Sequence, residues 1–228
     1  MGTEREHDRL IANAARDVLG TQGFLRKGRS RLWFADYRWW LILVEFQPSG
    51  WSRGSYLNVG AKWLWSPFSS WSFDFAFSPA ARVNGLVEYQ SEDQFRTASR
   101  ELANTAAREA LRLREAFPDI SAVADRLADK ASDCSDGWNA YHAGVAAYLA
   151  GRTAKAEQFF TDLSRPRPDD PPDAEWLHDL RATARMFATI TGERDALREA
   201  LEDFVKQSRI SLRLRGSNFE LPNADRRF

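Results

Sequence analysis

The spacing of apolar residues changes once along this 228-residue chain, and the change restricts the folds that the chain can adopt. Between Leu32 and Phe77 apolar and polar residues largely alternate, which is the two-residue period of β-strands. From Ser91 onward apolar residues recur every three or four positions, as they do on one face of an α-helix. We therefore expect an α+β protein in which a sheet is followed by helices.

Aromatic residues are concentrated in the alternating stretch. It holds seven of the nine tryptophans, namely Trp33, Trp39, Trp40, Trp51, Trp63, Trp65 and Trp71. Aromatic side chains bury a large area and also form good contact surfaces. The stretch therefore predicts either the core of a small domain or a core together with a binding face.

The first part of the chain is expected to contain an opening helix, an antiparallel sheet of four or five strands and a long closing helix. The opening helix is predicted at residues 4–20, and the strands at residues 32–36, 39–47, 56–65 and 71–78, with a short edge strand at 86–89. Both faces of the second strand are apolar until Glu45, which is typical of a central strand covered on both sides. We expect Trp63, Phe73 and Phe75 to be buried against the two helices.

The long closing helix is predicted to begin near Ser91 and to end before Pro118, so the chain should divide between Phe117 and Ser121. Beyond it, helices are predicted at residues 120–127, 138–150 and 153–163 and on both sides of Gly192, with a Pro-rich connector at 165–172. The predicted domains are an aromatic-rich α+β domain at 1–117 and a helical-hairpin domain at 118–212, followed by a tail at 213–228.

A turn before the sheet carries Gly23-Phe24 followed by Arg26-Lys27-Gly28-Arg29, and a later strand ends in Glu45-Phe46-Gln47. Over residues 4–117 these features resemble an uncharacterised bacterial family, a domain of unknown function with a Gly-Phe-x-(Lys/Arg)-Lys-Gly-Arg turn before an antiparallel sheet. The resemblance implies the fold of that family and brings no established activity or catalytic residues with it.

Small and large residues in and after the stretch 138–164 have the spacing of a helical hairpin, with Gly144, Gly151, Ala156, Phe160 and Pro168. This spacing resembles one hairpin of a tetratricopeptide repeat, in which small residues allow two antiparallel helices to approach closely. The resemblance implies a peptide-binding role, although such repeats normally need about three stacked copies for stability. We expect Phe160 to pack near Gly144, and Thr153 to cap the second helix.

Charge and cysteine content exclude several functional classes. Lys and Arg total 32, as do Asp and Glu, so the chain has no net charge and lacks the positive field of a general nucleic-acid binder. No stretch approaches the roughly 20 apolar residues of a membrane span, and the charged start lacks the apolar core of a secretory signal. Cys134 is the only cysteine, which excludes an intrachain disulfide and a cysteine-based metal cluster. We expect a cytoplasmic protein without a cofactor, whose partner is another protein.

Polar residues on three predicted strands are candidates for a site on one side of the sheet. They are Glu45, Gln47, Asn58, Lys62 and Asp74. If the strands are neighbours, these acid, amide and ammonium groups would share a pocket walled by Trp39 and Tyr56. The alternative is a solvent-facing side with incidental cross-strand pairs, each worth about 0.2–1 kcal/mol.

The basic run that includes Arg26, Lys27 and Arg29 is a second candidate, because arginine makes bidentate contacts to phosphate or to an acidic partner. Zero net charge favours the alternative of a solvated turn. No metal-ligand partner at suitable spacing accompanies any of the histidines, His7, His142 and His178. We therefore expect the histidines to have structural or surface roles.

These features favour a non-enzymatic protein-binding module, in which aromatic sheet surface or helical hairpins engage another protein. An immunity or accessory protein of a bacterial competition or phage-defence system would suit this design by analogy. The enzymatic alternative is a metal-dependent nuclease of the restriction type, with Asp36 and Glu45 holding a divalent ion. That class usually has a lysine two residues after the glutamate, and Gln47 stands there instead. We expect no metal-dependent cleavage of DNA or RNA.

Overall fold

The computed structural model describes residues 6–133, 137–168, 174–216 and 218–224. These residues form an α+β fold with a five-stranded antiparallel sheet followed by helices, which confirms the predicted fold class. The chain divides into two compact units, which we call the sheet unit (Met1–Lys62 with Ser72–Glu115) and the helical unit (Trp63–Trp71 with Ala116–Phe228). The later boundary lies close to the predicted one at Phe117. The segment Trp63–Trp71, in contrast, groups with the helices and not with the sheet.

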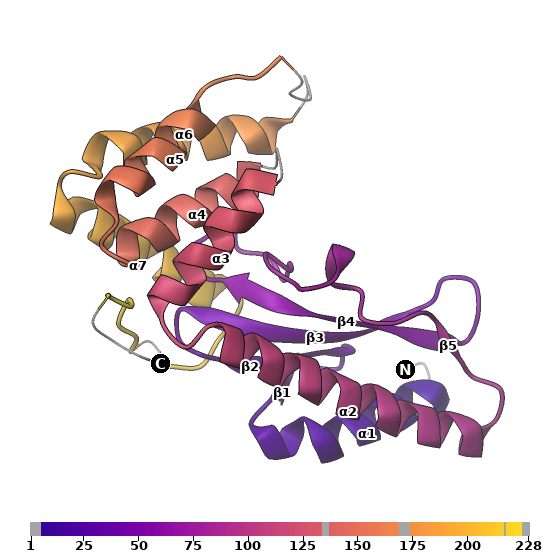
Figure 1. Ribbon diagram of the computed structural model, residues 1–228. Helices are drawn as coiled ribbons and strands as arrows, with labels where there is room; N and C mark the ends of the chain where they lie inside the picture. Colours follow the sequence, from indigo (N-terminus) through magenta and orange to yellow (C-terminus); the bar gives the residue numbers. More distant parts are fainter. Residues whose placement is uncertain (1–5, 134–136, 169–173, 217, 225–228) are drawn as a thin grey trace. The chain divides into compact units, whose positions relative to one another are not determined.

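Within the sheet unit the strands follow one another in chain order, β1-β2-β3-β4-β5 (Figure 1). The elements are α1 (Glu6–Val18), a 3₁₀ helix (Gly20–Gln22), β1 (Leu25–Arg26), β2 (Leu32–Asp36), β3 (Trp40–Pro48), β4 (Gly54–Trp63), a second 3₁₀ helix (Pro79–Ala81), β5 (Val87–Glu88) and α2 (Glu92–Ala116). Both predicted helices and the strands β2 to β5 are therefore present. The sequence did not predict β1, which is two residues long and pairs Leu25 with Phe34 of β2.

Helices α1 and α2 lie side by side along the sheet (Figure 1). Arg9 of α1 is 3.5 Å from Glu92 of α2, between Nη2 and Oε1. The side of β3 that carries Ile42 faces α2, because Ile42 and Ala110 line the same cavity. Successive strand residues point to opposite faces, so Glu45 and Gln47 point away from the helices. The buried stripe of α2 is Phe95, Leu102, Ala106, Ala110 and Leu113, as its helical spacing predicts.

The strand predicted at residues 71–78 does not form. Only Phe75 makes a bridge, to Ala61 of β4, and the backbone N–H of Ala61 donates to Phe75 O at 2.7 Å. The segment passes so close to β4 that a Cβ atom on Gly60 would lie 2.6 Å from Phe75 O. Phe75 is buried as predicted, whereas Phe73 is only half-buried, because the segment forms a single bridge to β4 and does not continue as a paired strand.

In the helical unit the described residues from Ile120 onward form helices and no named strand. These helices are α3 (Ile120–Asp133), α4 (Gly137–Leu149), α5 (Thr153–Ser164), α6 (Glu175–Ile190) and α7 (Arg194–Ser211). None of the described helices is both long and apolar enough to cross a membrane. The tail is better held than its lack of a period predicts, because Leu221 is buried and its carbonyl accepts a hydrogen bond from Arg198 Nη2 at 2.9 Å.

Helices α4 and α5 pack closely where the sequence predicts it. A Cβ atom on Gly144 would lie 2.6 Å from Cε1 of Phe160, so only glycine allows the ring to sit there. Gly151 ends the first helix with a φ of 75°, a left-handed conformation that favours glycine. The predicted cap is wrong, because Thr153 is already the first helical residue. Arg152 takes the cap position without a side-chain hydrogen bond.

Two tryptophans that alternate like strand residues belong to the core of the helical unit. Trp63 stacks on Trp65 with ring centroids 5.2 Å apart, and Trp65 Nε1 donates to Nδ1 of His142 at 3.1 Å. The hydroxyl of Tyr141 donates to Trp65 O at 2.9 Å, and burial raises the pKa of Tyr141 well above its ordinary value. Because indole is a donor only, Nδ1 of His142 must be the unprotonated nitrogen. These contacts explain why Trp63–Trp71 groups with the helices, and they confirm a structural role for His142.

Candidate functional site

The polar residues of β3 and β4 meet around Asn58, on the side of the sheet away from the helices. Asn58 Nδ2 donates to Glu45 Oε2 and to Gln47 Oε1, both at 2.9 Å. Arg82, from the loop before β5, donates from Nε to Asn58 Oδ1 at 2.8 Å and from Nη2 to Gln47 Oε1 at 2.7 Å. We call Glu45, Gln47, Asn58 and Arg82 the Asn58 cluster. The sequence predicts that the first three share one side of the sheet, and it does not indicate Arg82.

Arg82 also links the cluster to the aromatic surface of β4. Its guanidinium lies 4.0 Å from the ring centroid of Tyr56, a cation–π contact. Tyr56 and Arg82 are both half-buried, so part of this contact is open to solvent. Because Asn58 is buried and its amide is fully engaged, the cluster holds β3, β4 and the loop together and leaves Tyr56 and Arg82 as its accessible part.

Lys62 and Asp74 form a separate pair further along β4, four positions beyond Asn58. Lys62 Nζ lies 3.2 Å from Asp74 Oδ2 and 3.2 Å from Ser72 Oγ. Only 1% of the Lys62 side chain and 9% of the Asp74 side chain are exposed. This is a buried ion pair with its hydrogen bonds made inside the protein, and it has no opening for a ligand.

Two further candidate residues, Trp39 and Asp36, lie apart from the Asn58 cluster. Trp39 is buried beside Trp40 and stands six positions before Glu45, about 20 Å away along the strand. Asp36 pairs with Leu41 and Glu45 with Leu32, so the two acids are four positions apart, or about 13 Å. That separation is too large for the two acids to hold one ion directly. Among the described residues no three His, Cys, Asp or Glu side chains are grouped to hold a metal ion.

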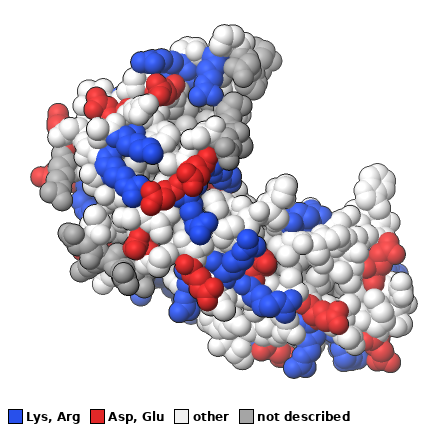
Figure 2. Space-filling model, viewed as in Figure 1, with Lys and Arg blue, Asp and Glu red and all other residues white. Residues whose placement is uncertain are grey.

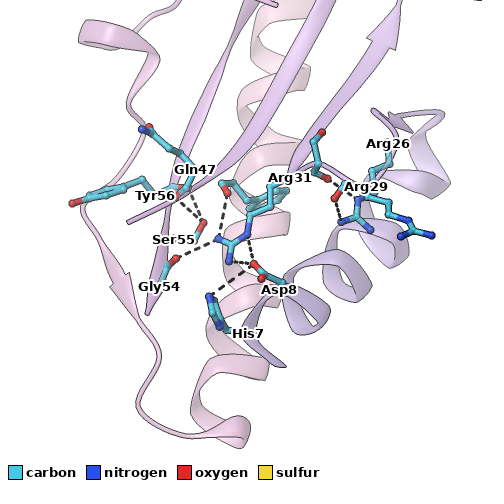
Figure 3. A network of polar contacts seen from close by, with 11 residues as sticks. His7, Asp8, Arg26, Arg29, Arg31, Gln47, Gly54, Ser55 and Tyr56 are labelled. Atoms are coloured by element: carbon cyan, nitrogen blue, oxygen red, sulfur yellow. Dashed lines mark hydrogen bonds and ion pairs between the residues drawn. The ribbon is translucent and has the colours of Figure 1, made fainter. Parts of the chain in front are cut away.

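The basic turn after β1 is partly closed on itself (Figure 3). Arg26 donates from Nε to Ser30 O at 2.7 Å and from Nη2 to Arg29 O at 3.0 Å. Lys27 and Arg29 are exposed at the surface of the turn. The guanidinium of Arg26 thus stabilises its own turn, and the structure does not show a three-residue clamp for phosphate.

Arg31, at the end of the same basic run, is a structural residue (Figure 3). Its guanidinium pairs with Asp8 of α1, through Nε at 2.6 Å, and donates from Nη1 to the carbonyl oxygens of Phe46 and Gly54 at 3.4 and 3.3 Å. His7, one of the histidines expected to have a structural or surface role, is buried next to this pair. Arg31 therefore joins α1 to the β3–β4 hairpin.

One large apolar side chain of the sheet unit is almost completely exposed. Trp51, at the tip of the β3–β4 hairpin, has 99% of its surface open to solvent. The tip is shaped by Ser49, whose Oγ accepts the backbone N–H groups of Trp51 at 3.2 Å and Ser52 at 3.3 Å. The sequence predicts a turn here. It carries no signal that separates this ring from the buried tryptophans, since a Pro-Ser-Gly turn is compatible with either position.

Basic and acidic side chains are mixed on the face of the molecule that Figure 2 draws. In the view of Figure 2, basic and acidic side chains are interspersed over both units and no large field of one sign is visible. Cys134 and its acidic neighbour Asp136 lie outside the described residues. His178 is exposed on α6, the surface role that its isolation predicts.

Comparisons with protein-family models, with curated proteins and with solved structures found no match to this chain. The candidate site therefore has to be interpreted from its own geometry.

Proposed function

We propose that this protein is a non-enzymatic module that binds another protein through the end of the β3–β4 hairpin. The observation that carries the proposal is the exposure of Trp51, 99%, on a turn that its own hydrogen bonds hold in shape. An indole ring has a large apolar area, and its exposure to water is unfavourable. Burying the ring against a partner would therefore stabilise a complex. An immunity or accessory protein of a bacterial competition or phage-defence system remains our proposal for the biological setting, by analogy of design.

The residues near Trp51 are those that dominate protein interfaces. Arg53 is exposed two positions after it, and Tyr56 and Arg82 follow at the same end of β4. Tryptophan, tyrosine and arginine are the residue types most enriched among interface hot spots. The Asn58 cluster holds Tyr56 and Arg82 in place before binding, so little side-chain freedom would be lost on association.

A protein partner fits the hairpin tip better than a lipid surface does. The tip, residues 48–53, contains one aromatic ring and no other large apolar side chain. Stable membrane anchoring needs a large buried apolar face or two independent anchors. A protein pocket, in contrast, can gain several kcal/mol from one ring, and truncating a hot-spot residue typically costs about 2 kcal/mol or more.

The test is to identify a partner by crosslinking from position 51 in an extract of the source organism and then to measure its affinity by calorimetry. We expect Trp51→Ala to weaken binding of the purified partner about 30-fold or more, which corresponds to about 2 kcal/mol. Leu25→Ala is the matched control, because Leu25 is another exposed apolar residue of the sheet unit and lies outside the hairpin. Its affinity should equal that of the unmodified protein.

Two results would contradict the proposal. One is a partner that binds Trp51→Ala as tightly as the unmodified protein. The other is binding of the protein to phosphatidylcholine vesicles that is lost in Trp51→Ala, which would assign the ring to a membrane surface. The melting temperature should be nearly unchanged in Trp51→Ala, since a ring this exposed makes little contribution to folding.

A further inference from the structure

A groove beside α2 has the shape and charge of a small-molecule site. It is a cavity of about 380 Å³, within the range of roughly 300–1,000 Å³ that is usual for ligand sites. Leu111 of α2 supplies exposed apolar surface. Phe24, from the turn before β1, and Ile42 of β3 also line the groove, with 6% and 1% of their surfaces exposed. Half of the Leu111 surface is exposed to solvent.

The polar part of the groove is entirely basic or neutral. Arg108 and Arg114 lie three positions before and after Leu111, so all three residues share one stripe of α2. Arg108 donates to Thr105 Oγ1 at 2.8 Å, and neither arginine has an acidic partner among the described residues. Tyr37 completes the polar part, and its ring is held by stacking on Trp40 with centroids 4.8 Å apart.

The acid closest in sequence to Tyr37 faces the other way. Asp36 pairs with Leu41, whereas its neighbour Ala35 pairs with Ile42, which lines the groove. Directly paired residues lie on the same face of a sheet, so the Asp36 carboxylate is on the opposite face. No carboxylate lines the groove in the part of the chain that the structure describes.

We propose that this groove binds an anionic small molecule with an apolar body, such as an aliphatic or aromatic carboxylate or sulfonate. The apolar body lies against Phe24, Ile42 and Leu111, and the acidic group accepts hydrogen bonds from Arg108 and Arg114. Arginine suits this role because its guanidinium makes charge-assisted, bidentate contacts to such groups. The site is separate from the hairpin tip and does not depend on the protein-binding function.

The experiment uses the full chain and the fluorescent probe 8-anilinonaphthalene-1-sulfonate, with decanoate as competitor. We expect saturable probe binding that decanoate displaces and that the uncharged analogue 1-decanol displaces much more weakly. The double variant Arg108→Gln/Arg114→Gln should weaken probe binding about tenfold or more, the factor for losing one charge-assisted hydrogen bond. Leu111→Glu, which adds a negative charge among the arginines, should also abolish displacement by decanoate.

Arg100→Gln is the matched control, since Arg100 is an exposed arginine on the same helix and does not line the groove. It removes one of the two positive charges that the double variant loses, and it should leave probe binding unchanged, as should Trp51→Ala. The melting temperature of each variant shows whether a partly unfolded chain is binding the probe, which such states also do. Equal displacement by decanoate and 1-decanol, or equal loss in Arg100→Gln and in the double variant, would overturn the proposal. An acidic peptide that binds the groove when decanoate does not would assign it to a protein partner instead.

Discussion

Each of the two units is stabilised internally by a different kind of contact. The sheet unit places polar groups inside and pairs them, as in Arg31 with Asp8 and Lys62 with Asp74. The helical unit relies on ring contacts and close helix approach, with Phe160 packed on Gly144 and against Phe187. Polar pairs fix direction as well as distance, whereas apolar packing mainly fixes volume. The sheet unit should therefore be more sensitive to the loss of a single partner, and the helical unit to a change of size.

The largest effect is expected from breaking the Lys62–Asp74 pair in the sheet unit. Asp74→Leu removes the carboxylate and leaves the buried ammonium of Lys62 with a neutral hydroxyl, which should destabilise the protein by about 3–5 kcal/mol. The double variant Lys62→Met/Asp74→Leu should recover most of this loss, because an apolar pair replaces the ionic one. Urea denaturation measures the free energy of unfolding of the single and the double variant. A single variant as stable as the unmodified chain would show that the pair contributes nothing to the sheet unit.

The corresponding size change in the helical unit is Gly144→Ala. Its Cβ atom would lie 2.6 Å from the Phe160 ring, so we expect a loss of about 1–3 kcal/mol from overpacking. Adding Phe160→Leu to Gly144→Ala should recover part of the loss, since the smaller side chain makes room for the methyl group. An unchanged melting temperature in Gly144→Ala would argue against close approach of α4 and α5.

A smaller effect is expected from a single buried hydrogen bond in the helical core. Tyr141→Phe removes the donor to Trp65 O and should cost about 1–2 kcal/mol, because a buried carbonyl then lacks its partner. Burial raises the pKa of Tyr141 in the folded state. The neutral Tyr141 hydroxyl therefore contributes its full stabilisation below the unfolded pKa of about 10, and this contribution is lost as the pH rises above that value. Absorbance at 295 nm should show one tyrosine that ionises only when the chain unfolds. Ionisation of all tyrosines in the folded protein would contradict this.

The smallest effect concerns a surface ion pair of the helical unit. A hydrogen bond from Arg152 lowers the pKa of Asp125, so this pair contributes stability above the unfolded pKa of Asp125, and the contribution is lost as the pH falls through the lower folded pKa. Asp125→Asn should cost less than about 1 kcal/mol at neutral pH, because exposed pairs are screened by solvent. Thermal melting should show a larger difference between variant and unmodified protein at pH 7 than at pH 3. If Asp125→Asn lowered the free energy of unfolding as much as Asp74→Leu does, the expected difference in stabilisation between buried and exposed ion pairs would be wrong.

Part of the candidate site could be predicted from the sequence. Strand alternation places Glu45, Gln47 and Asn58 on one side of neighbouring strands, and the structure joins all three by hydrogen bonds. Arg82 could not be predicted, because it comes from an irregular loop whose path no period describes. The exposure of Trp51 could not be predicted either, because it depends on the direction in which the tip of the hairpin points.

The sequence by itself determined the elements whose residues repeat with a clear period. It determined β3 as a covered strand, α2 as an amphipathic helix and the glycine that admits Phe160 between α4 and α5. The period of apolar residues and the size of each side chain are local properties, so they can be read directly from the sequence.

Only the tertiary structure decided which partner each apolar face received. Trp63 and Trp65 have the alternation of strand residues and yet pack with Phe117 and His142 in the helical unit. The segment 71–78 alternates in the same way, but it forms a single β-bridge to β4, at Phe75, and no strand. Alternation of apolar and polar residues predicts that one face of a strand is buried, and it does not specify which element covers that face. The reason is that the hydrophobic effect depends on the apolar area removed from water and not on the identity of the neighbour.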